Sequence, residues 1–97
     1  MINKIFLSIL LLLVSSNTLF AKMEHYQQGI KLFKNNKLEE AKFKFEQDIV
    51  FNPKSELSYL FLSKIFNKQD KNNLEEQNLN TVILLNPKNE EAIYHLA

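Results

Sequence analysis

The stretch NNKLEEAKFKFEQDIVFNP (residues 35–53) decides the fold, because it contains a helix together with the signals that start and stop it. Its apolar residues recur at steps of three, four and four and therefore share one helix face: Leu38, Ala41, Phe45 and Ile49. Asn36 is predicted to be the N-cap, and Glu39 three residues later would complete a capping box. Pro53 cannot donate a hydrogen bond in a continuing helix, so the helix ends before it.

The same stop signal recurs further along the chain. Asn-Pro-Lys occupies residues 52–54 and again residues 86–88, an interval of 34 residues, each time directly after an apolar run. These two signals and the polar turns divide the sequence into helical segments, which are predicted at 23–34, 38–51, 54–66, 74–85 and 89–97. The motif Leu-Glu-Glu recurs after 36 residues instead, at Leu38 and Leu74, which predicts a shorter second helix in the second unit. One glycine and two prolines leave little material for β-hairpins, so the predicted fold is all-α.

A 34-residue unit of helix, turn, helix and closing proline resembles the tetratricopeptide repeat (TPR). The resemblance extends over residues 22–97 and rests on the family's small residue, the alanine and aromatic of its second helix, and its closing proline. These are matched by Gly29, Ser63, Ala97, Ala41, Phe45, Pro53 and Pro87. The second unit departs from the pattern, because Glu75 stands where the family has its signature alanine.

The resemblance implies an α-α solenoid of TPR-like helical hairpins. Its expected divisions are a first repeat at 22–55, a second repeat at 56–89 and the start of an incomplete third repeat at 90–97. Because repeat arrays are stabilised by contacts between neighbouring repeats, and about three repeats are needed, we expect a truncated or short member of the family.

Residues 1–21 have the pattern of a secretory signal peptide. Lys4 precedes an apolar core at residues 5–14, and a polar-to-small tail ends at Ala21. The apolar core is shorter than the roughly 20 residues of a membrane-spanning helix. We therefore expect export through the general secretory route to the periplasm or the medium; the alternative is a membrane anchor formed by an uncleaved signal.

The composition argues against several function classes. The chain has 12 basic side chains, all of them lysine, and 11 acidic ones, so it lacks the clustered cations of a nucleic-acid-binding protein. Adjacent glutamates at 39–40, 75–76 and 90–91 are predicted to open helices, where acids complement the helix dipole. No nucleophile constellation, phosphate-binding loop or metal motif is found in the sequence. We therefore expect no catalytic residue, no cofactor, no metal and no enzyme activity.

Three residues need separate interpretation. His25 and His95 fall on first helices two repeats apart, too distant to share a metal ion, and His25 is expected to form a half-buried wall of the first hairpin. Asp48 is an acid at a position where the two helices of a hairpin usually touch. Since a buried unpaired charge is costly, we predict that the helix rotates to bring Asp48 to solvent or to a lysine. The alternative is a functional group with a perturbed pKa.

In the TPR family the first helices of the repeats line a concave face, and this resemblance gives the candidate binding groove. Its predicted residues are Tyr26, Ile30, Phe33, Leu57, Leu60, Lys64 and Tyr94. A subclass of the family holds a terminal carboxylate with lysine and asparagine at the positions of Tyr26 and Ile30, so that clamp is absent. An apolar and aromatic groove suits an amphipathic helix or an apolar segment of a protein partner. The alternative is that Tyr26, Ile30 and Phe33 only pack against the neighbouring first helix.

The expected function is therefore that of a non-catalytic protein–protein interaction module in an exported compartment. Three alternatives remain open: the N-terminal repeat arm of a longer cell-envelope enzyme, a self-associating helical protein, or a membrane-tethered adaptor.

Overall fold

The computed structural model describes residues 25–97, and the predicted signal peptide lies outside this range. The described chain is all helical and contains no strand, which confirms the predicted all-α class. Its first helix is described over residues 25–34, and the others are α2 (Leu38–Phe51), α3 (Glu56–Lys68), α4 (Asn72–Leu85) and α5 (Glu90–Leu96). Over the described range, no helix has both the length and the apolar character needed to cross a membrane.

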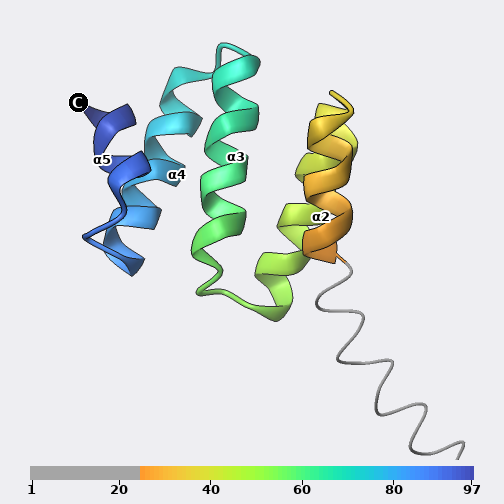
Figure 1. The fold of residues 1–97 in the computed structure, drawn as a ribbon, viewed down its shortest axis with the longest axis horizontal. Coiled ribbons are helices and arrows are strands. Elements are labelled where there is room, and N and C mark those ends of the chain that lie inside the picture. The colour runs from red at the N-terminus through yellow and green to blue at the C-terminus, as the bar shows by residue number, and fades with distance from the viewer. Residues whose placement is uncertain (1–24) are drawn as a thin grey trace, which may run out of the picture.

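Helix α3 is the central element of the fold. Figure 1 shows it between the pair formed by the first helix and α2 on one side and the pair α4 and α5 on the other. One buried cluster joins α2 to α3 and consists of Ala41, Phe45, Leu62, Ile65 and Phe66. The first helix packs on this cluster through half-buried apolar side chains. A second cluster joins α3 to α4 and α5: Leu60, Leu79, Val82 and Ala92. Because α3 contributes residues to both clusters, it connects the two halves of the chain.

The 34-residue interval of the sequence is repeated in the backbone hydrogen bonds. After the first helix, the Lys37 N–H donates to the Leu32 carbonyl at 2.9 Å, and after α3 the Lys71 N–H donates to the Phe66 carbonyl at 2.9 Å. The ends of α2 and α4 match in the same way: Asn52 N–H to Asp48 carbonyl and Asn86 N–H to Val82 carbonyl, each 2.7 Å. Residues 34 apart are called equivalent below.

The turn after the first helix corrects the predicted capping box. Asn36 has a φ of 59° and its equivalent, Asp70, has a φ of 57°, so both take the left-handed conformation that ends a helix. Lys37 is the N-cap residue of α2, and its side chain makes no capping bond. Asn36 therefore closes the first helix and does not start the next one; asparagine and aspartate tolerate this conformation better than most residues.

The predicted shortening of the fourth helix is also wrong. Helices α2 and α4 both have 14 residues, and they begin at the equivalent positions Leu38 and Asn72. The turns before them close with the same hydrogen bonds, which fixes where each helix begins. The displaced Leu-Glu-Glu motif at residues 74–76 therefore lies within α4 and does not shift its start.

Helix α5 depends on a side-chain cap. The Asn89 Oδ1 accepts a hydrogen bond from the Ala92 N–H at 2.9 Å, and the Asn89 Nδ2 donates to the Glu56 Oε1 at 2.6 Å. Because α5 has only seven residues, Asn89→Ala should fray it, at a cost of about 1 kcal/mol. Amide exchange in α5 measures this. The matched control is Ser55→Ala, since Ser55 precedes α3 at the equivalent position without a side-chain capping bond. Equal exchange in both variants would contradict the capping role.

Candidate functional site

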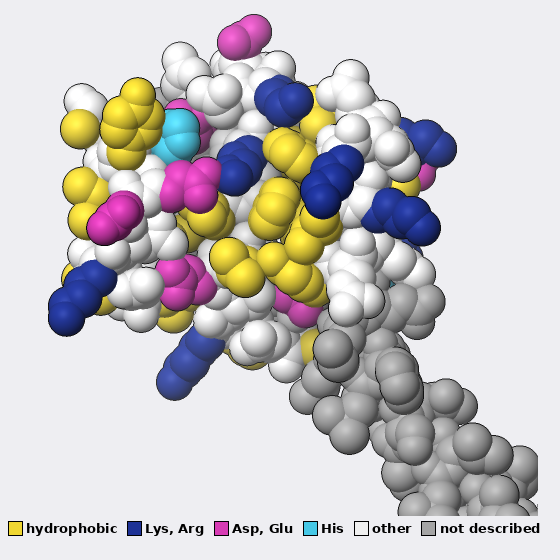
Figure 2. Space-filling model, in the orientation of Figure 1, with side chains coloured by type: hydrophobic (Ala, Val, Ile, Leu, Met, Phe, Trp, Pro, Cys, Tyr) yellow, Lys and Arg dark blue, Asp and Glu magenta, His cyan; other side chains and the backbone are white. Residues whose placement is uncertain are grey.

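The first helix, α3 and α5 form one face of the molecule. The ring of Phe33 on the first helix lies 5.3 Å from that of Phe61 on α3, measured between centroids. The Lys64 Nζ on α3 lies 2.7 Å from the Glu91 Oε1 on α5. Figure 2 shows hydrophobic side chains gathered in the middle of this face, with lysines and acidic side chains around them. The face is thus apolar at its centre and charged at its edge.

The groove residues predicted on the first helix are partly used in packing. Tyr26, Ile30 and Phe33 are half-buried and pack against the first core cluster. The Tyr26 ring contacts that of Phe61 edge-on, with centroids 6.3 Å apart. This is the packing against the neighbouring helix that the alternative interpretation predicted, and each of the three side chains keeps part of its surface exposed.

Leu60 is not a groove residue. It is 4% exposed and belongs to the second core cluster, which includes Ala92 of α5. Its equivalent, Tyr94, is 77% exposed, and α5 is the last helix of the described chain. The prediction of an exposed Leu60 was therefore wrong, because α4 and α5 pack against this residue.

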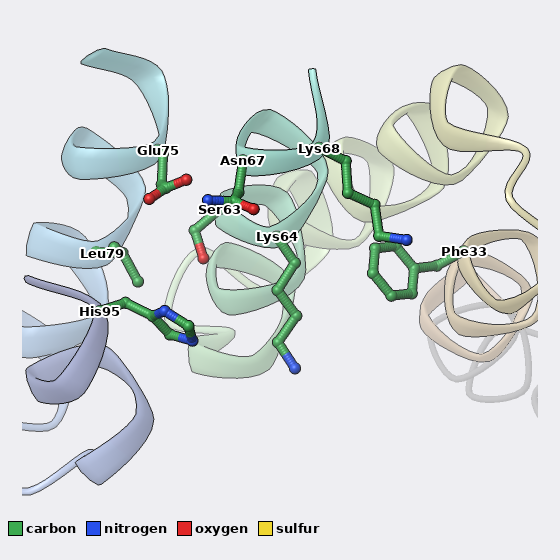
Figure 3. Close-up of a pocket in the computed structure, with 8 residues that line it drawn as sticks. All are labelled: Phe33, Ser63, Lys64, Asn67, Lys68, Glu75, Leu79 and His95. Atoms are coloured by element: carbon green, nitrogen blue, oxygen red, sulfur yellow. The ribbon is translucent and has the colours of Figure 1, made fainter. Parts of the chain in front are cut away.

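A first cavity of about 240 Å³ lies between the first helix, α3, α4 and α5 (Figure 3). Its lining combines apolar, cationic, amide and acidic groups: Phe33, Ser63, Lys64, Asn67, Lys68, Glu75, Leu79 and His95. Two of the predicted groove residues, Phe33 and Lys64, meet here. The other lining residues come from α3, α4 and α5.

In the first cavity the two lysines have interaction partners, whereas one acidic oxygen has none. Lys64 is paired with Glu91, and the Lys68 Nζ lies over the Phe33 ring, 5.2 Å from its centroid. By contrast, the Glu75 Oε2 is buried and has no hydrogen-bond partner. Since a buried acceptor without a donor is unfavourable, this oxygen favours binding of a group that brings a donor into the cavity.

A second cavity of about 570 Å³ lies where α2 connects to α3. It is lined by Tyr26, Asp48, Phe51, Asn52, Lys54, Ser55, Glu56 and Leu57. The predicted groove residues thus fall into two places: Tyr26 and Leu57 line this cavity, whereas Phe33 and Lys64 line the first. Ile30 and Tyr94 line neither.

Asp48 lies in the wall of the second cavity and is 5% exposed. The Ser58 hydroxyl on α3 donates a hydrogen bond to the Asp48 Oδ2 at 2.5 Å. The prediction that Asp48 turns to solvent or to a lysine was wrong, because α3 brings a donor to it. Burial raises the pKa of the Tyr26 phenol, and the negative charge of Asp48 raises it further. The phenol is therefore neutral at physiological pH.

The two histidines lie in different surroundings. The half-buried His25 ring stacks on Phe51 with centroids 5.7 Å apart, which confirms its expected role as a wall of the first hairpin. His95 lines the first cavity, and its ring contacts Tyr94 edge-on. Residues 25–97 contain no group of three or more side chains placed to hold a metal ion.

Sequence reasoning missed Ser58, Phe61 and Glu75 as site residues. The Phe61 ring stacks on Phe45 at 5.0 Å and contacts two rings of the first helix, so it organises the aromatic centre of the face. A signal for Ser58 was present in the sequence, because Asp48 and Ser58 are equivalent to the apolar residues Val82 and Ala92. A polar pair in place of an apolar pair indicates a contact between its members.

No protein-family model matches this chain, and the search of curated proteins gives no match.

Proposed function

We propose that this chain is a TPR-like, non-catalytic protein–protein interaction module that acts in an exported compartment. The observation that carries the proposal is the repetition of the same turn hydrogen bonds at equivalent positions, Lys37 to Leu32 and Lys71 to Phe66. Repetition of one helical unit builds an array with an extended inner surface, and such surfaces bind segments of other proteins. Export is supported by the apolar segment at residues 5–14 with Lys4 before it.

The chemistry of the face supports a partner that is an amphipathic helix. An apolar side chain of the partner would enter the first cavity between Phe33 and Leu79, and a polar hydrogen of the partner would satisfy Glu75. Lys68, which has no ion pair within the described residues, would face an acidic residue at the edge of the partner. The exposed ring of Tyr94 would extend the contact onto α5.

The proposal predicts which surface substitutions matter. Peptides selected from a random library against the protein should be amphipathic, and Lys68→Ala and Tyr94→Ser should each weaken their binding by roughly tenfold. Both changes should leave the fold intact, because Tyr94 is 77% exposed and Lys68 is exposed and has no ion pair within the described residues. Fluorescence anisotropy with labelled peptides measures the affinities.

The control variants lie on α2, where Phe43 and Val50 are 57% and 77% exposed and line neither cavity. Phe43→Ser and Val50→Ser should bind the selected peptides as the unmodified protein does. Failure to select any peptide would contradict the proposed function. Weaker binding only in the α2 variants would move the interface to α2.

A further inference from the structure

The two connections between hairpins have the same backbone but different buried side chains. Where α2 leads into α3, the buried contact is polar: Ser58 donates to Asp48 at 2.5 Å. Where α4 leads into α5, the equivalent residues are Val82 and Ala92, and both are fully buried in an apolar cluster. The contact between α4 and α5 shows that two helices can pack together at this position without a buried charge. Asp48 is therefore not needed for closure.

The second cavity also has aromatic residues in its wall where the connection between α4 and α5 has leucines. Tyr26 and Phe51 are replaced at the equivalent positions by Leu60 and Leu85. By contrast, Asn-Pro-Lys is the same at both, in residues 52–54 and 86–88, so Lys54 belongs to the repeated turn. The first connection alone combines a carboxylate with aromatic walls.

The buried Asp48 carboxylate is not paired with a cation within the described chain, although Lys54 also lines the second cavity. Asp48 is 5% exposed, its hydrogen bond comes from a neutral hydroxyl, and neither ion pair of the described chain includes it. The other lining acid, Glu56, already accepts hydrogen bonds from the side chains of Asn86 and Asn89. A buried carboxylate is stabilised most by a cation that also donates hydrogen bonds, and aromatic faces attract cations.

We propose that the second cavity binds an arginine side chain of the partner segment. The guanidinium would donate to the Asp48 carboxylate, and its plane would stack against the aromatic wall that includes Tyr26 and Phe51. The volume of about 570 Å³ leaves room for such a side chain. This inference rests on the proposed function, since it names one side chain of the partner that the array binds.

A small probe tests the cavity without the partner. N-acetyl-arginine amide, titrated into the isotope-labelled protein, should shift the backbone amide resonances around Asp48 and Ser58. The neutral isostere N-acetyl-citrulline amide should bind at least about tenfold more weakly, because it lacks the charge that Asp48 attracts. The amides of Val82 and Ala92, which are equivalent, serve as the internal reference and should not move.

Two variants replace residues of the second cavity by the residues found at the equivalent positions between α4 and α5. Asp48→Val with Ser58→Ala installs the pair found at Val82 and Ala92, and it should bind the arginine probe at least about tenfold more weakly while keeping its helical signal. Phe51→Leu, at a residue that is 52% exposed, should weaken binding to a smaller extent.

Equal binding of the arginine and citrulline probes, measured on the unmodified protein, would overturn the inference even if a variant failed to fold. Unchanged arginine binding by the folded double variant would overturn it as well. Either result leaves the proposed function standing if peptide binding still depends on Lys68 and Tyr94. Loss of that dependence, with the arginine site intact, would instead overturn the proposed function.

Discussion

Ala41→Glu should unfold the pair formed by the first helix and α2, with a loss of about 3 kcal/mol or more in the free energy of unfolding. Ala41 has no exposed surface and lies in the first core cluster beside Phe45. A glutamate here would place a carboxylate in an apolar contact, and its longer side chain would force the two helices apart. Circular dichroism during thermal and urea unfolding measures the loss.

The second hairpin provides a matched control for this change, because Glu75 occupies the position equivalent to Ala41. It is half-buried at the first cavity, and its Oε2 has no donor. Glu75→Ala should change stability by less than about 1 kcal/mol, since relief of the unpaired oxygen offsets the loss of an acid in the first turn of α4. A wild-type melting curve for Ala41→Glu would contradict the packing of α2 described above.

Ser58→Ala should destabilise the protein by roughly 2 kcal/mol, because it leaves the buried Asp48 carboxylate without its hydroxyl donor. Asp48→Val alone should also destabilise, since the buried Ser58 hydroxyl then loses its acceptor. The double variant should be about as stable as the unmodified protein, or more stable, because it reproduces the apolar pair of Val82 and Ala92. Urea unfolding of the four proteins gives the coupling energy between the two sites.

The reciprocal experiment uses the other connection. Val82→Asp should destabilise strongly, and Ala92→Ser in the same chain should recover part of the loss, because the equivalent Ser58 lies within hydrogen-bonding distance of Asp48. Additive effects in both pairs would contradict the equivalence of the two connections. If only Asp48 and Ser58 showed coupling, the backbone around Val82 and Ala92 would be unable to hold a polar pair.

Part of the candidate face could be predicted from the 34-residue period of the sequence. Phe33 and Lys64 were predicted and line the first cavity, and Tyr26 and Leu57 were predicted and line the second. Their division between two cavities could not be predicted, since it depends on how the side chains of different helices pack together. The free acceptor on Glu75 also arises only from the packing of α4 against α3.

By itself, the sequence determined the helices and the period that relates them. The predicted segment at 38–51 is the observed α2, because its apolar stripe and the following proline are local features that act within the helix itself. Tertiary structure alone decided which equivalent residues are buried: Leu60 is 4% exposed and Tyr94 is 77% exposed. It also decided that Asp48 stays inside, since its donor comes from α3. Burial and hydrogen bonding between helices depend on which neighbouring helix covers a residue. A periodic sequence pattern gives equivalent residues the same position in a helix, but it does not give them the same neighbours.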